Sequence, residues 1–446
     1  MSLSEKQTSN IEAGGWQFGT LLTTDHVWDS FVILTLLDLH KCNNTRLQVL
    51  HTGDQKDRFT AVMQERNTYI IQYGQDEAGH FCKNRYNPNG VFRHKCHIIV
   101  SDGLNMGFPC CGSFRCINPL TNNRHRFCTN HFALHGVCTV DGCDNLVAPD
   151  TKTCTLPAHS KMERLHNERG KAAFTLKERL QKHRKTHPSS KVADSDGHVE
   201  ADEDGEDDIE TFEIDGTGGV RMHTEKHPGS IGVVDTPDID ECEAKKAEAR
   251  NRRFKAKLGH QRTHNEQTLI RPCGVFHARA TMYGAEAVSN VLLFVQAAFS
   301  VPAAHRPEHL VYDTNCDTKQ QVNADPVRWA WFKDMGMCVD VWHFMNKHAV
   351  THQFWQEHCN PADYPELLGP DGKWFFNTSV AEQTNVWLRG YHSMCREMLP
   401  VKYNFFLDEM ICLRNEAVVA KLTQDGRLNV HLLVQMYSPN EIQFLL

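Results

Sequence analysis

The sequence of 446 residues lacks any apolar run of the ~18 residues that a membrane-spanning helix needs, so we expect no membrane partner. It also lacks a charged segment followed by an apolar one at its start, which is the pattern of a secretory signal, and we expect the protein not to be secreted. Hydrophobic residues make up 40% and charged residues 23% of the chain, which excludes a wholly disordered protein and leaves room for two or three domains.

Neither sign of charge dominates the whole chain, but each dominates one block. Residues 194–215 hold twelve Asp or Glu and no Lys or Arg, whereas residues 245–262 hold eight Lys or Arg and one Glu. The net charge of −7 is therefore a poor guide to partners, and the local blocks matter more.

Cysteine and histidine are abundant, with 17 and 27 residues. An odd number of cysteines without a secretory signal argues against a disulfide framework and for reduced thiols or metal ligands. Nine of the cysteines lie in residues 80–160 among many turn-forming residues. Such a segment cannot build an ordinary hydrophobic core, so we expect metal ions to hold it together.

Spacing separates these residues into two sets of three thiols and one imidazole. The sets are Cys111, Cys116, Cys128 and His131, and Cys138, Cys143, Cys154 and His159. Each set matches a closed tetrahedral zinc site with a structural role, although free buried cysteines are the plainer alternative. A third, incomplete set is also present: Cys82, Cys96, Cys110, His94 and His97.

Composition and periodicity predict five segments. They are an N-terminal helical segment (16–79), a cysteine-cluster module (80–160), a basic helix (161–187), a flexible acidic linker (188–240) and an α/β domain (241–425). In the last, strands are expected at 268–282, 309–313 and 337–341, and helices at 284–300, 342–356, 378–398 and 404–421.

Three acids of this α/β domain are candidates for a metal site. Asp313 and Asp340 end short apolar strands, and Glu382 lies in the first turns of a predicted helix. Converging carboxylates hold pairs of Mg²⁺ ions in phosphodiester chemistry, although acids at strand ends often only cap loops. His343 and His348 follow Asp340 at helical spacing, which fits either a zinc site or a polar helix face.

The motifs together resemble the KDZ (Kyakuja–Dileera–Zisupton) transposase-related proteins, in the version that carries cysteine clusters before the transposase region. The motifs are His51–Phe59, Asp102–Cys111, Arg126–His131, Arg262–Gln267, Cys273–Val275, Tyr312–Cys316, Asp340–Phe344, Cys359–Pro361 and Asn377–Gln383. The resemblance covers residues 20–420 apart from the acidic linker.

The resemblance implies an RNase H-like α/β core, a mixed sheet with helices, that uses a DDE-type two-metal mechanism. Asp313 matches the second acid and Glu382 the third. No Asp-Gly-Asn-Phe-like motif is found for the first acid, so Glu243 is the expected candidate, with Asp240 near it and Asp215 further away.

The basic segment directly before the predicted core contains Arg252, Arg253, Lys255 and Lys257. A run of charges is usually a solvated face, but these residues also suit phosphate contacts and a nuclear localisation signal.

We therefore expect a nuclear, transposase-derived DNA-binding protein, ancestrally an enzyme of DNA cleavage and strand transfer. It would hold two structural zinc ions, and Mg²⁺ or Mn²⁺ if active. DNA is the expected partner, and a homo-oligomer is included because active transposases assemble on DNA ends. The alternatives are a catalytically inactive, zinc-dependent binder of DNA or protein, and a zinc hydrolase that uses His343 and His348.

Overall fold

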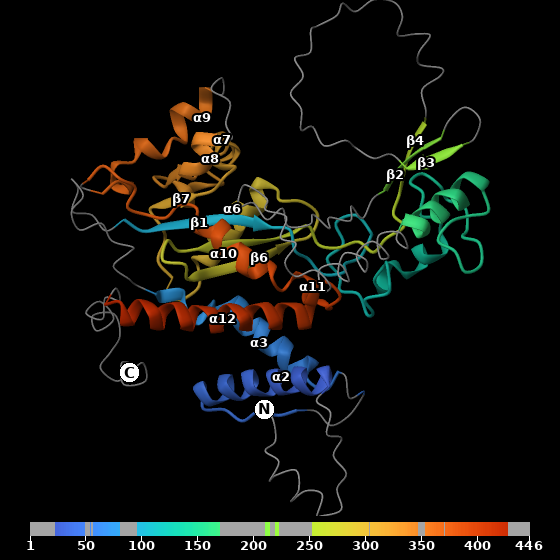
Figure 1. Cartoon of the computed structure of the whole chain (residues 1–446), viewed down its shortest axis with the longest axis horizontal. Coiled ribbons are helices and arrows are strands. Elements are labelled where there is room, and N and C mark those ends of the chain that lie inside the picture. The colour runs from blue at the N-terminus through green and yellow to red at the C-terminus, as the bar shows by residue number, and fades with distance from the viewer. Residues whose placement is uncertain are drawn as a thin grey trace, which may run out of the picture. The chain divides into compact units, whose positions relative to one another are not determined.

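The computed structural model describes the following residues: 23–49, 54, 57–80, 96–169, 210–214, 219–222, 252–302, 304–346, 353–369 and 371–426. The chain forms two units (Figure 1). Unit 1 combines residues 1–106 with residues 265–446, and unit 2 is the segment Gly107–His264 between them. Unit 2 is therefore an insertion in the chain of unit 1.

A five-stranded mixed sheet forms the centre of unit 1, in the order β6-β5-β1-β7-β8. Its strands are β1 (Ile98–Leu104), β5 (Asn265–Ile270), β6 (Phe276–Met282), β7 (His309–Val311) and β8 (Gly336–Cys338). β1 pairs antiparallel with β5 and parallel with β7, and β8 continues the parallel part. The central strand of the sheet thus comes from the part of the chain that precedes the insertion.

Alternation along β1 sends successive side chains to opposite faces of the sheet. Ile99 packs with Leu269 and Leu310 in a core cluster that also holds Val291 and Val295 of α6 (Val288–Ala298). Val100 and Asp102 have the opposite parity and face α10 (Val380–Arg389), which contacts β1 and β5. One face of β1 therefore lies in the hydrophobic core, and the other face lines a polar pocket.

Shorter helices follow the parallel strands of unit 1. They are α7 (Asn315–Ala324) after β7, α8 (Val341–Asn346) after β8, then α9 (Gln353–His358) and, beyond α10, α11 (His392–Cys395). Single 3-10 turns complete this part: η2 (Asp76–Gly79), η5 (Ala330–Phe332), η6 (Pro361–Asp363) and η7 (Pro365–Leu367).

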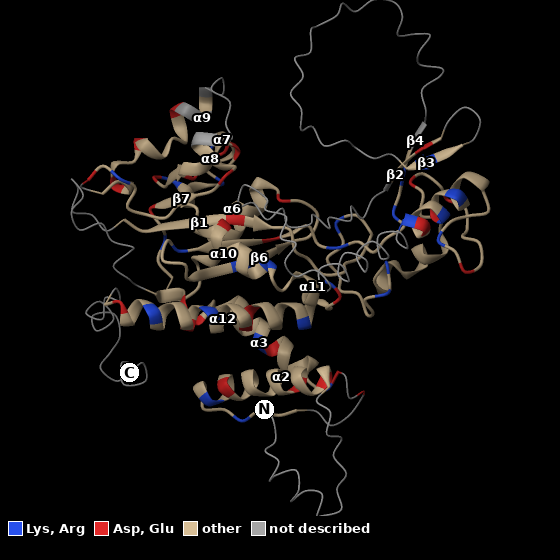
Figure 2. Cartoon of the chain, in the orientation of Figure 1, with Lys and Arg blue, Asp and Glu red and all other residues tan. Residues whose placement is uncertain are grey.

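Three long helices form a second layer in unit 1: α2 (Thr24–Cys42), α3 (Thr60–Tyr73) and α12 (Pro400–Gln424). Their apolar side chains meet in one cluster that includes Leu36, Met63 and Phe405. α2 carries Asp25 in its first turn and Lys41 in its last turn, which matches the helix dipole. Acidic and basic positions along this helix are coloured in Figure 2. No helix among the described residues is long and apolar enough to cross a membrane.

Unit 2 contains a three-stranded sheet in the order β3-β2-β4 and a helix over residues 157–169, which includes the described part of the predicted basic helix (161–187). The strands are β2 (Glu210–Ile214), β3 (Val220–Met222) and β4 (Arg252–Ala256), and a 3-10 segment, η4 (Thr129–Gly136), lies among the cysteines. Phe212 and Ala256 pack with Cys138 and Cys154 in one buried cluster. The sheet and the cysteine segment therefore share a core.

The mixed α/β sheet with helices confirms the coarse fold prediction, but the segment boundaries differ from those expected. β1 lies inside the predicted cysteine module (80–160), yet it pairs with β5 of the predicted α/β domain. The expected acidic linker (188–240) contributes β2 and β3, and β4 extends the sheet of unit 2. The predicted single strand at 268–282 is a hairpin that turns at Gly274 (φ 89°).

Candidate functional site

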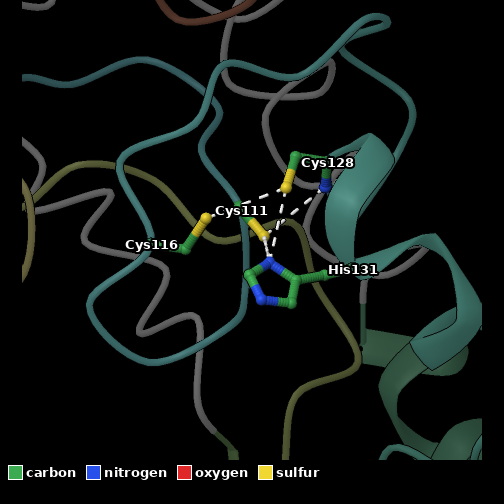
Figure 3. Close-up of side chains that lie close together, drawn as sticks. All are labelled: Cys111, Cys116, Cys128 and His131. Atoms are coloured by element: carbon green, nitrogen blue, oxygen red, sulfur yellow. Dashed lines mark hydrogen bonds between the residues drawn. The ribbon is translucent and has the colours of Figure 1, made fainter.

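Two Cys₃His clusters lie in unit 2, and their members are the two sets that the spacing predicted. In the first, Figure 3 shows Cys111, Cys116, Cys128 and His131 converging on a common centre. The Sγ atoms of Cys111 and Cys128 lie 3.5 and 3.4 Å from Nδ1 of His131, and the Sγ atoms of Cys116 and Cys128 are 3.7 Å apart.

The second cluster repeats these distances. The Sγ atoms of Cys138 and Cys154 lie 3.4 and 3.3 Å from Nδ1 of His159, and the Sγ atoms of Cys143 and Cys154 are 3.8 Å apart. Asn145 donates a hydrogen bond to Cys154 from outside the cluster.

These distances fit tetrahedral zinc. With Zn–S of about 2.3 Å and Zn–N of about 2.05 Å, a tetrahedral angle places sulfur and nitrogen about 3.6 Å apart and two sulfurs about 3.8 Å apart. Burial raises the pKa of the Cys128 thiol, but hydrogen bonds from His131 lower it to about 6, so a thiolate is favoured there. Each cluster could therefore hold one zinc ion, with all four positions filled by the protein and none open to a substrate.

The third predicted set does not form a cluster among its described members. Cys96 and His97 lie in unit 1 and Cys110 in unit 2, whereas Cys82 and His94 lie outside the described residues. In the described part of the chain, the two Cys₃His clusters are the groups in which three or more potential ligand atoms all lie within 4.8 Å of one another.

Acidic side chains gather at one pocket of unit 1. Asp102 comes from β1, Asp313 follows β7, Asp340 follows β8 and Glu382 lies in the first turn of α10; all four line the same pocket. The carboxyl ends of the parallel strands β1, β7 and β8 meet at one edge of the sheet, and the acids at these ends are thereby brought together.

Asp102 is held in place by α10. Its Oδ2 accepts a hydrogen bond of 2.9 Å from Nδ2 of Asn385, whose Oδ1 accepts one of 3.2 Å from Thr268 of β5. Burial, together with the charges of Asp313 and Glu382, raises the pKa of Asp102 to about 7. The three carboxylates repel one another, so a cation among them would lower the free energy of the pocket.

Asp340 is engaged differently from the other three acids. Its carboxylate accepts hydrogen bonds from Ser379 Oγ at 3.1 Å and from the backbone N–H of Trp342 at 2.9 Å, and it is bonded to Nδ1 of His343. Nε2 of His343 lies 3.6 Å from Oε1 of Glu382. Asp340 therefore caps the start of α8 and orients His343, and the imidazole lies between Asp340 and Glu382.

The pocket thus contains Asp313 and Glu382, the two acids that the resemblance implies, together with Asp102. Glu243, Asp240, Asp215 and His348 lie outside the described residues. Asp102 was missed because β1 was placed in the cysteine module. A signal was available, since Ile98–Asp102 is an apolar run ending in an acid, as is His309–Asp313.

The predicted basic residues lie in unit 2, on and directly after β4. Arg252 and Arg253 belong to this strand, and their side chains are not among those described. Lys255 is exposed and Lys257 half-buried. Backbone hydrogen bonds join this segment to the chain around the second Cys₃His cluster. The N–H of Asp141 donates to the C=O of Lys255, and the N–H of Lys257 donates to the C=O of Thr139. The basic segment is therefore anchored to the cysteine-rich region.

Comparison with known proteins supports the resemblance drawn from the motifs. Residues 100–165 match the family model of the CxC6 like cysteine cluster associated with KDZ transposases. The chain thus carries a cysteine cluster of the type associated with KDZ transposases. The matched range contains both Cys₃His clusters, and it begins within β1. The chain matches no curated protein and no solved structure.

Proposed function

We propose that the protein is a KDZ-type, transposase-derived DNA-processing protein whose unit 1 is an RNase H-like core of DDE type. The observation that carries the proposal is the convergence of Asp102, Asp313 and Glu382 on one pocket. Three antiparallel strands continued by two parallel ones, with one acid on the central strand and one following its parallel neighbour, are the arrangement expected of such a core.

The donor set fits Mg²⁺ or Mn²⁺. Both are hard cations that prefer carboxylate oxygens. Burial, and to a smaller extent the charges of Asp313 and Glu382, raise the pKa of Asp102, and a bound cation would favour its ionised form. Asp102, Asp313 and Glu382 would hold the ions, because both carboxylate oxygens of Asp340 already have protein partners: Oδ1 accepts from Ser379 and Trp342, and Oδ2 lies against His343. When bound, such ions activate a water or a DNA 3′-hydroxyl and stabilise the leaving oxygen of the phosphodiester.

Residues of the chain would keep these carboxylates in position before any ion arrives. Asn385 fixes Asp102 from α10, and His343 lies against Glu382. In the absence of an ion, such contacts limit the movement of the acids away from the pocket.

Unit 2 has features that suit DNA. The sequence from Gly103 to Val140 contains no Asp or Glu. Phe114 is 83% exposed, and the guanidinium of Arg115 lies 5.0 Å from the centre of its ring. An exposed ring beside a cation can stack on a base while the cation contacts phosphate. We include genomic DNA as partner, and hence the nucleus as location, in the proposal.

The test uses the full chain, because a fragment beginning at residue 240 would lack β1 and Asp102. Mn²⁺ binding is measured by calorimetry for the wild type and for Asp102→Asn, Asp313→Asn and Glu382→Gln. We expect each variant to lose the specific binding event. Asp371→Asn, an exposed acid outside the pocket, is the matched control and should bind as the wild type does. Unchanged Mn²⁺ binding in all three variants would contradict the proposed metal site.

Cleavage separates the proposal from its main alternative, the inactive zinc-dependent binder. The alternative drew its support from the missing first acid, and Asp102 supplies a third carboxylate to the pocket. The proposal predicts Mn²⁺-dependent nicking of plasmid DNA that the three pocket variants lose. Mn²⁺ binding without nicking, on DNA carrying the element's own ends, would favour the binder.

DNA contact is tested separately through its dependence on salt. Replacing Lys255 with Ala should lower affinity for duplex DNA and reduce the slope of log affinity against log salt by about 1, as expected for one lost phosphate contact. Lys333→Ala in unit 1 is the control. An unchanged salt slope in Lys255→Ala would show that Lys255 does not contact DNA phosphate.

A further inference from the structure

The helix α2 has an apolar side that the described part of unit 1 leaves exposed. Its inner side packs in the helical layer, where Val32 and Leu36 are buried against Phe405 of α12. On the opposite side, four apolar side chains are 37–63% exposed: Val27, Ile33, Leu34 and Leu37. In Figure 1, α2 lies on the side of this layer away from the sheet. A continuous apolar row on the outside of a folded unit is typical of a contact surface.

The exposed side of α2 has the spacing of a coiled-coil seam. Its exposed residues follow one another at alternating intervals of three and four: Val27, Ser30, Leu34, Leu37 and Lys41. This repeat of seven residues keeps the side chains in one stripe along a helix, where a second helix can pack against them. Single exposed apolar residues need no partner, but a seam of about four turns indicates one.

The seam is symmetric about its centre, which lies between Ile33 and Leu34. Ser30 is as far from this point in one direction as Leu37 is in the other. Two antiparallel copies of α2, related by a twofold axis at the centre, place the small Ser30 of each copy against the large Leu37 of the other. A twofold axis requires a surface that is complementary to itself, and this pattern meets the requirement.

The charges of α2 favour the same antiparallel arrangement. Asp25 in the first turn and Lys41 in the last turn are both exposed and lie almost equally far from the centre. In the antiparallel pair, each Asp25 therefore lies within about 1.5 Å along the helix axis of being level with Lys41 of the second copy. The same register brings Asp29 level with Asp38 of the second copy, but Asp29 is ion-paired with Arg58. A parallel pair would instead place like charges together.

We propose that α2 is a homodimer interface, whose partner is a second copy of this chain packed antiparallel through Ile33, Leu34 and Leu37. A helix of this length extends about 28 Å, and one pair of such helices buries less than the roughly 800 Å² per partner of a standard interface. We therefore expect a dissociation constant in the micromolar range. The interface contains no residue of the acidic pocket, and the proposal does not depend on the activity of that pocket.

The test is analytical ultracentrifugation of the full chain between about 1 and 200 µM, a range that brackets the expected dissociation constant. The wild type should change from monomer to dimer over this range. Leu34→Glu places two like charges beside the twofold axis and should remain monomeric throughout. Val327→Glu, at an 86% exposed apolar position of unit 1 outside α2, is the control and should dimerise as the wild type does. A monomeric wild type, or equal association of Leu34→Glu and wild type, would overturn the proposal.

Exchange of the charges tests whether the partner is a second, antiparallel copy. Asp25→Lys and Lys41→Asp should each weaken dimerisation about tenfold, because each converts both ion pairs of the dimer into like-charge contacts. The double variant restores opposite charges across the interface and should dimerise within about threefold of the wild type. A double variant weaker than both single variants would contradict the antiparallel pair. Urea unfolding of each variant checks that the folded unit is retained.

Discussion

Asn385 and Asp102 are 283 residues apart in the chain and are joined by a hydrogen bond of 2.9 Å between Nδ2 and Oδ2. The bond links α10, which carries Glu382, to the central strand of the sheet. It therefore couples the positions of two acids of the pocket.

Replacing Asn385 with Ala should weaken Mn²⁺ binding by about 10- to 100-fold, because loss of a group that orients a ligand typically costs this much affinity. Calorimetry at pH 7.5 measures the effect. Val386→Ala, at the neighbouring exposed position of α10, should leave affinity unchanged. Equal affinities in the two variants would mean that Asn385 does not position Asp102 for metal.

The metal-free protein should lose stability as the pH rises from 4 towards 8. The pKa of Asp102 is raised from 3.8 to about 7, so folding favours its protonated form. This contribution is fully present below pH 4 and is lost as the pH rises through 7, at a rate of up to about 1.4 kcal/mol per pH unit.

Thermal unfolding between pH 4 and 8 measures this trend in two parallel series. One series is free of Mg²⁺ and Mn²⁺, and the other contains added Mn²⁺. The difference between the wild type and Asp102→Asn should grow with pH in the metal-free series and shrink when Mn²⁺ is added. A difference that stays constant with pH would contradict the assignment of a raised pKa to Asp102.

Gly103 follows Asp102 where the backbone is closely approached by two side chains. A Cβ atom at this position would lie 2.5 Å from Nδ2 of Asn265 and 2.6 Å from Oε2 of Glu286, which are bonded to each other at 2.7 Å. Gly103→Ala should therefore destabilise the protein by about 1–3 kcal/mol and weaken Mn²⁺ binding. Gly284→Ala, where a Cβ meets nothing within 4 Å, is the control. Chemical unfolding and calorimetry measure the two effects.

A buried ion network joins the β5–β6 hairpin to α12. Arg279 donates to Glu266 at 3.0 Å and to Asp408 at 2.9 Å, and all three side chains are at most 9% exposed. Arg279→Met leaves two acids buried without their cation and should cost about 3–5 kcal/mol in the free energy of unfolding.

Arg389→Ala, at an exposed position of α10, should change the free energy of unfolding by less than about 0.5 kcal/mol. Urea unfolding of both variants compares them under one condition. A cost below 1 kcal/mol for Arg279→Met would show that the network contributes little to stability.

The members of the two Cys₃His clusters could be predicted from the sequence because short spacings and turn-forming residues bring them together locally. Cys128 and His131, for example, are three residues apart and need only one turn to face the same ion. The apolar strands before Asp313 and Asp340 were predicted for a similar reason, since their patterns are local.

The first acid could not be found in this way because its partners are distant in the chain. Asp102 was read as part of the cysteine module, and the first acid was sought at Glu243, close to the predicted core. Only the pairing of β1 with β5 and β7 shows that the core begins before the cysteines.

The place of unit 2 in the chain also affects how unit 1 can fold. Leu104 and Glu266 face each other in the sheet, so the strands on either side of the insertion pair as if joined by a tight turn. During synthesis β1 emerges first but must wait for the whole of unit 2 before β5 and β7 exist. Until then the apolar strand β1 is unpaired, which favours aggregation of the nascent chain. Early folding of unit 2 would shorten the flexible loop between β1 and β5 and thereby lower the entropic cost of pairing them.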